Sequence, residues 1–220
     1  MRLPHSHALH APASPGPHGS GWAGRTLAGI LRMGRAPAVL AVGDTVDVPD
    51  EGERSRQALR RLATLNPRLD IVDACQPAAG LAEAASAARE APRRNFDLAV
   101  VFLGNAEVLR LASCCRYAPV ASDALASLGM RARQVFVITA FDAAQLAREE
   151  AGDITRPLQR RHQWLCRTLR DLCAQHGVEL LDLSALPVGD REEGGASRAG
   201  SEAWTTRMLQ RPALAHLVFG

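Results

Sequence analysis

Five short apolar segments divide most of this chain into strand-length pieces, and they limit its possible folds more than any other feature. Each is rich in Val, Ile, Leu or Ala and lacks the polar alternation of a strand with one face in water. The segments are Ala38–Val42, Leu69–Val72, Leu98–Leu103, Val135–Thr139 and Val178–Leu183. Such segments are typical of parallel strands that are buried on both faces.

Helix-length stretches separate the expected strands. We expect helices over 52–65, 80–91, 105–112 with 120–129, and 143–174, and a last helix over 198–210. Strand–helix–strand units with right-handed crossovers place helices on both faces of one sheet. The sequence therefore predicts an α/β fold, a three-layer α/β/α sandwich with a five-stranded parallel sheet.

The expected domain does not occupy the whole chain of 220 residues. Residues 1–34 are rich in Pro, Gly and His and show no strand or helix period, which predicts a disordered tail. We expect the α/β domain over 35–212 and a C-terminal tail over 213–220. The polar stretch 188–200 is the one long loop expected inside the domain.

The chain contains no lysine, because all 26 of its basic residues are arginine. This excludes a P-loop lysine, a Schiff-base lysine, a Ser-Lys dyad and the lysine of a protein kinase. The formal net charge is +3, and 23 acidic residues are interleaved with the basic ones. That pattern is not the clustered basic surface of a nucleic-acid-binding protein, so we expect no nucleic-acid partner.

The cysteines and the apolar runs bear on the compartment. The five cysteines form no CxxC pair, which favours neither a disulfide framework nor a zinc site. No run of 18 apolar residues exists, so we expect no membrane span. The first residues lack the apolar centre of a secretory signal, although their arginines faintly resemble an organelle transit segment. We therefore expect a cytoplasmic protein without cofactor or metal.

Candidate functional residues follow the strands, because functional loops in parallel α/β folds lie beyond the carboxyl ends of the strands. The first expected strand runs into Gly43-Asp44-Thr45, and the third runs into Gly104-Asn105-Ala106-Glu107.

Taken in order, these blocks resemble the SGNH/GDSL hydrolase family over residues 38 to about 210. The resemblance rests on the Gly-Asp opening, the block FDLAVVFLGN, the helix ending in AQHGVELLDLS and a final loop that leads into a helix. It implies acyl transfer by a serine, a histidine and an oxyanion hole. It also implies small acyl esters, lipids or acetylated carbohydrates as the ligand class.

The family's nucleophilic serine corresponds to Thr45, and the aspartate before it is retained as Asp44. Threonine carries the same hydroxyl group, but its β-methyl restricts χ1 and crowds the path of attack. Thr45 is therefore a weaker candidate nucleophile than a serine would be.

The oxyanion hole of the family uses a glycine N–H and an asparagine side chain. The glycine position of the second block falls near Ala78, with Gly80 two residues later. In the third block Gly104 is retained, but Ala106 stands in the asparagine position. Asn105 would have to turn by one residue to replace it, and a slip of one residue after a strand reverses the side chain's direction.

The family's Asp-x-x-His pattern in the last loop corresponds to Glu192 through Gly195. Glu192 holds the position of the orienting carboxylate, and Gly195 holds that of the base. Loss of a general base alone typically removes about 10²–10⁴-fold in rate. The substitutions together therefore favour a retained fold with a degenerate catalytic site.

No other histidine is an evident replacement. We expect structural roles for His162 and His176, while His216 lies in a tail that is long enough to fold back. One helical stripe, expected to face the core rather than to bind a metal, contains His162, Cys166, Leu169 and Cys173.

Three functions remain open. The leading hypothesis is a catalytically degenerate domain that binds a small acyl-ester or carbohydrate ligand, or a protein partner, in the former catalytic cleft. The first alternative is an active ester hydrolase that uses Thr45 with an unrecognised base, and the second is a scaffold module. The candidate site residues are Asp44, Thr45, Gly104, Asn105 and Glu192.

Overall fold

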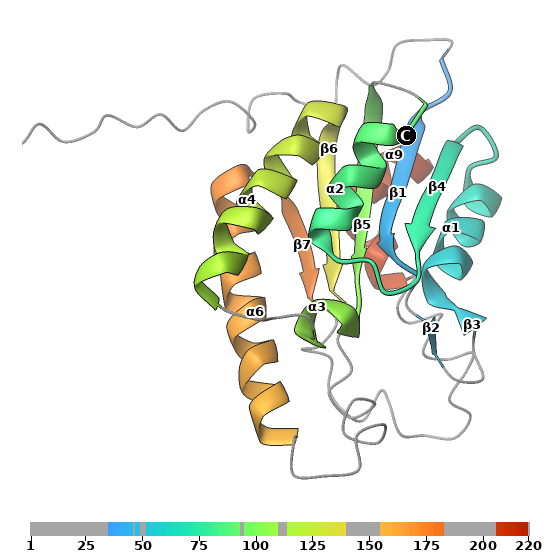
Figure 1. Cartoon of the computed structure of the whole chain (residues 1–220). Coiled ribbons are helices and arrows are strands. Elements are labelled where there is room, and N and C mark those ends of the chain that lie inside the picture. The colour runs from blue at the N-terminus through green and yellow to red at the C-terminus, as the bar shows by residue number, and fades with distance from the viewer. Residues whose placement is uncertain are drawn as a thin grey trace, which may run out of the picture.

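A five-stranded parallel sheet forms the centre of the protein (Figure 1). The computed structural model describes residues 35–45, 47–48, 52–92, 95–109, 114–139, 155–182 and 206–219. The strands are β1 (Ala38–Asp44), β4 (Asp70–Gln76), β5 (Phe96–Leu103), β6 (Ala132–Thr139) and β7 (Glu179–Asp182), and their order in the sheet is β4-β1-β5-β6-β7. These are the five expected strands, so the predicted fold class is confirmed.

Helices cover both faces of this sheet (Figure 1). One face carries α2 (Leu81–Glu90), α4 (Cys114–Arg131) and α6 (Thr155–His176), and the other carries α1 (Arg54–Leu65) and α9 (Pro212–Phe219). The short α3 (Asn105–Leu109) follows β5 at the carboxyl edge. The first part of the helix expected over 143–174, residues 143–154, lies outside the described residues.

Burial on both faces explains the apolar composition of the central strands. All seven residues of β1 are buried, and side chains from it alternate between the two helical layers. Leu40 packs in the core under α2 and α4, whereas Val39 packs in the core under α1 and α9. A strand in this position cannot carry polar residues on either face without losing their hydrogen bonds to water.

The C-terminal residues differ from the expectation of a tail over 213–220. Residues Pro212–Phe219 form α9, in which Leu214, Leu217 and Val218 are buried in the core on its side of the sheet. The carbonyl of Leu217 also accepts a hydrogen bond from Asn66 Nδ2 at 2.7 Å. The spacing of three and four between the buried side chains is that of one helix face.

The segment between β1 and α1 contains a small sheet that the sequence pattern does not predict. Its two antiparallel strands are β2 (Asp47–Val48) and β3 (Gly52–Glu53), which follow β1 and precede α1 along the chain. The predicted tail 1–34 and most of the predicted helix 198–210 lie outside the described residues. Within the described ranges, no helix is long and apolar enough to cross a membrane.

Candidate functional site

The carboxyl end of β1 lies between β4 and β5, so its last residues meet the loops that follow both neighbours. Gly43 has a φ of +104°, and a Cβ added there would collide with the carbonyl oxygen of Phe102 on β5. Only glycine tolerates this left-handed conformation and this close backbone approach. A glycine at position 43 is therefore required by the local geometry of the site.

Asp44 joins the three loops. The residue is 8% exposed, and Oδ1 accepts a hydrogen bond from the backbone N–H of Ala78 at 2.9 Å. Its Oδ2 occupies the place that a Cβ on Gly104 would need. The carboxylate thus holds the loop after β4 against the turn after β5, and it brings together three positions that the sequence resemblance singled out.

Thr45 is held mainly through its backbone. Its N–H donates to the carbonyl of Gln76 at 3.3 Å, and its carbonyl accepts hydrogen bonds from both the N–H and the hydroxyl of Ser55. The residue is 1% exposed, and Oγ1 has no hydrogen-bond partner among the described residues. A buried hydroxyl without a partner costs about 1–3 kcal/mol, so it requires an explanation.

Ala78, at the expected glycine position of the second block, has a φ of +56°. This left-handed conformation favours glycine and costs an alanine roughly 1–2 kcal/mol. The hydrogen bond to Asp44 Oδ1 fixes the peptide in this orientation. The loop therefore retains a glycine-like conformation although the residue is alanine.

Replacing Ala78 with glycine is expected to stabilise the protein. The substitution removes the left-handed strain, and the Ala78 side chain is exposed, so little packing is lost. Part of the gain is offset by the larger backbone entropy of glycine in the unfolded chain, which leaves about 0.5–1 kcal/mol. Urea unfolding of Ala78→Gly measures the difference. The control is Ala87→Gly inside α2, which should destabilise by roughly 0.5–1 kcal/mol, and an equal loss in both variants would contradict the strain argument.

The third block provides different groups from those of the family pattern. Asn105 begins α3 immediately after Gly104, and Ala106 is buried at 8% exposure. A methyl group therefore occupies the position that the sequence resemblance assigned to an oxyanion-binding amide. The N–H of Gly80 is also occupied, since it donates to Glu83 Oε2 at 3.0 Å.

Glu107 has a role that the sequence did not indicate. Its Oε2 accepts a hydrogen bond from the N–H of Leu81 at 3.2 Å and lies where a Cβ on Gly80 would stand. A carboxylate at a helix N-terminus satisfies a free N–H group and interacts favourably with the helix dipole. Glu107 thereby fixes α3 against the start of α2, at the edge of the candidate site.

Two of the histidines that the structure describes have other partners. His176, at the end of α6, shares a hydrogen bond with Ser122 Oγ at 2.8 Å. His162 Nε2 lies 3.2 Å from the sulfur of Cys166, and His216 is exposed on α9. None of them bonds the hydroxyl of Thr45. Glu192 and Gly195 lie outside the described residues.

The expected cysteine stripe faces the core. Cys166, Leu169 and Cys173 are buried in the core between the sheet and its helices. Burial raises the pKa of the Cys173 thiol to about 12, which makes it an unreactive group at neutral pH. The described ranges contain no group of three side chains suited to a metal ion.

Comparison with known proteins gives structural relatives only. No family model and no curated protein matches the sequence. LAE5, an alpha/beta hydrolase enzyme from the metagenome of Lake Arreo, is 13% identical, with a TM-score of 0.57 over 84% of this chain and 97% of that one. Axe2, an acetylxylan esterase from Geobacillus stearothermophilus, is 13% identical, with a TM-score of 0.57 over 86% and 98%.

Catalytic mutants of Axe2, in which a serine, an aspartate or a histidine is replaced by alanine, match equally well. At 12–13% identity these likenesses concern the fold. The protein therefore shares the three-layer α/β/α fold of these structures.

Proposed function

We propose that the carboxyl edge around Thr45 binds a small acyl ester, with the threonine hydroxyl next to the ester carbonyl. The observation that carries this proposal is the buried Oγ1 without a partner among the described residues. A valine would fill the same space without the cost of an unpaired hydroxyl. A hydroxyl kept at the nucleophile position is explained if a ligand supplies its hydrogen bond.

The ligand class is supported by the fold. The similar structures include an alpha/beta hydrolase enzyme and an acetylxylan esterase, so acetylated carbohydrates belong to the class to be tested. An ester carbonyl accepts a hydrogen bond from a hydroxyl, which is the group that Thr45 offers. Asp44 orients the surrounding loops through Ala78 and Gly104 rather than by contact with the ligand.

We propose further that this site binds its ligand with little turnover. The sequence resemblance assigns the base to Gly195 and the oxyanion-binding asparagine to Ala106, which is buried. Without a base a hydroxyl is a very weak nucleophile at neutral pH. Removing one oxyanion donor costs a further factor of about 10²–10³.

Ester hydrolysis by Thr45 is the second candidate function. It is favoured by the esterase neighbours and by the place of Thr45, which lies at the end of β1 between two loops that Asp44 holds together. This function requires a general base that the described residues do not supply to Oγ1. The two candidates therefore share the ligand and differ in the chemistry.

Release of p-nitrophenol from p-nitrophenyl acetate distinguishes the two candidates. We expect the protein to hydrolyse this ester no faster than its Thr45→Ala variant does, because no base activates Thr45. The control is Thr64→Ala, which removes an exposed threonine on α1. A rate that falls in Thr45→Ala but not in Thr64→Ala establishes Thr45 as a nucleophile and the protein as a hydrolase.

Binding is measured separately, by saturation-transfer NMR with ethyl acetate and with acetylated xylose. We expect transfer to the acetyl methyl group in the native protein and in Thr64→Ala, and a clear loss in Thr45→Val. Equal transfer to the native protein and to Thr45→Val would overturn the proposed ester site.

A further inference from the structure

A serine and a histidine form a hydrogen-bonded pair between two helices on one face of the sheet. The helices are α4 and α6, which lie side by side (Figure 1). Ser122 Oγ on α4 and His176 Nε2 at the end of α6 are 2.8 Å apart. Both residues are half-buried, so the pair is held in place while part of each residue remains in contact with solvent.

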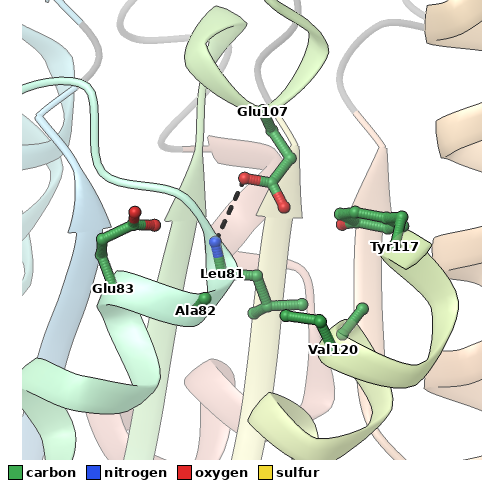
Figure 2. A pocket seen from close by; sticks show the side chains of 7 residues that line it. Leu81, Ala82, Glu83, Glu107, Tyr117 and Val120 are labelled. Carbon is green, nitrogen blue, oxygen red and sulfur yellow. Dashed lines mark hydrogen bonds between the residues drawn. The ribbon is translucent and has the colours of Figure 1, made fainter. Parts of the chain in front are cut away.

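The pair is separate from the other features of this region. A cavity of about 210 Å³ opens between the starts of α2, α3 and α4, and Val120 and Ala121 are among the residues that line it (Figure 2). Ser122 follows them in the chain but does not line this cavity, and it contacts α6 instead. Because His176 ends α6 shortly before β7 begins, the histidine lies toward the amino edge of the sheet, whereas Thr45 follows the carboxyl end of β1.

The pair combines a weak nucleophile with a base. A serine hydroxyl reacts slowly with an acyl carbon unless a base takes its proton during the attack. Neutral imidazole carries its proton on either nitrogen, and in the form protonated at Nδ1 the free Nε2 accepts the hydrogen bond of the hydroxyl. The distance of 2.8 Å lies in the range over which a general base acts. His176 is therefore placed to take the proton of Ser122.

A second serine provides an internal comparison. Ser86 on α2 donates its hydroxyl to Glu90 Oε1 at 3.4 Å, on the exposed surface. A carboxylate is a much weaker base than imidazole at neutral pH, so this hydroxyl has a partner without being activated. The bond of Ser86 is also more exposed than that of Ser122, so better access cannot explain a higher reactivity of Ser122.

We propose that Ser122 is an acyl-acceptor site for activated esters, with His176 as its general base. Ser122 Oγ forms a bond to the acyl carbon, the bond from that carbon to the leaving oxygen breaks, and the leaving group departs with the electron pair. The proton of Ser122 moves to His176 Nε2 and from there to solvent. A base acting alone suffices only for esters with a good leaving group, since other esters also require stabilisation of the oxyanion. The inference goes beyond the proposed function and does not depend on Thr45.

The test is acetylation of the full chain by p-nitrophenyl acetate, followed by peptide mass spectrometry. We expect Ser122 to be acetylated at least about tenfold faster than Ser86, because a positioned general base contributes about 10²–10⁴-fold in an enzyme. Fragment ions distinguish Ser122 from Ser127, which lies on the same helix. No lysine competes for the acetyl group, since the chain contains none. Ethyl acetate, whose leaving group is poor, should leave Ser122 unlabelled, and labelling by it would contradict the restriction to activated esters.

His176→Gln separates the base from the hydrogen bond. Glutamine retains a group that can bond Ser122 across the two helices, but it takes up no proton at neutral pH. We expect acetylation of Ser122 to slow by about tenfold, to the rate of Ser86, while the rate at Ser86 stays the same. Glu90→Gln is the matched control, because it changes the partner of Ser86 and should leave the rate at Ser122 as in the native protein.

Equal acetylation of Ser122 and Ser86 in the native protein would overturn the proposal, as would an unchanged rate at Ser122 in His176→Gln. Both results are expected if the bond only holds α4 and α6 together. If His176→Gln does not fold, the comparison of the two serines in the native protein decides the question alone. Acetylation of Ser122 releases p-nitrophenol equally from the native protein and from Thr45→Ala, so its outcome is distinguishable from that of the Thr45 assay.

Discussion

Thr45→Val is expected to stabilise the ligand-free protein by about 1–2 kcal/mol, an unusual direction for a substitution in a buried site. Thr45 is only 1% exposed, and its hydroxyl has no hydrogen-bond partner among the described residues. Valine has the same shape without the polar atom. For a domain of this size the gain corresponds to a rise of roughly 2–8 °C in Tm. Urea unfolding and calorimetry of the native protein and the variant measure it.

Thr139→Val provides the matched control. Thr139 ends β6, is fully buried, and donates its hydroxyl to Asp182 Oδ1 at 3.2 Å. The same chemical change should there leave a carboxylate short of a donor and destabilise by about 1–3 kcal/mol. If Thr45→Val destabilises as much as Thr139→Val, the Thr45 hydroxyl has a protein partner, and the argument for a ligand at this position fails.

The strands were predictable because their environment leaves few alternatives. A strand covered by helices on both faces is apolar along most of its length, and the runs ending at Val42, Leu103 and Ile138 have this character. Helix α9 was missed because eight residues at a chain end provide too little pattern to separate a helix from a tail. The strands β2 and β3 have two residues each, which is too short for any period to show.

The candidate site was predictable where a motif residue has a steric role. Gly43, Asp44 and Gly104 are such residues, since one glycine allows close strand contact and the other makes room for the carboxylate. The left-handed conformation of Ala78 was not predictable, because alanine rarely adopts it and nothing local marks it. The bond from Leu81 to Glu107 links residues that are 26 positions apart, so it depends on the tertiary fold.

Rebuilding the family's catalytic groups is expected to produce an ester hydrolase. The variant combines Thr45→Ser, Ala106→Asn and Gly195→His with Glu192→Asp. The fold already supplies Asp44 and Gly104 in contact with each other, so the first two new groups start from an ordered edge. We expect kcat/KM for p-nitrophenyl acetate to rise by on the order of 10–100-fold over the native protein, well below a natural esterase, because a misplacement of about 1 Å can cost 10²-fold.

The single substitutions are the controls for this variant, and each should change the rate very little, since nucleophile and base act as a unit. A large gain from Thr45→Ser alone would mean that a base is already present, and the second candidate function would then be correct. A folded but inactive fourfold variant would mean that the cleft does not admit the ester.

Ala106→Asn is the substitution to examine first in that case, because its larger side chain must fit where a buried methyl group now packs. Repeating the assay without it keeps nucleophile and base and sacrifices only the oxyanion donor, at a cost of about 10²–10³-fold. Comparison of the two variants therefore separates a closed cleft from a missing donor.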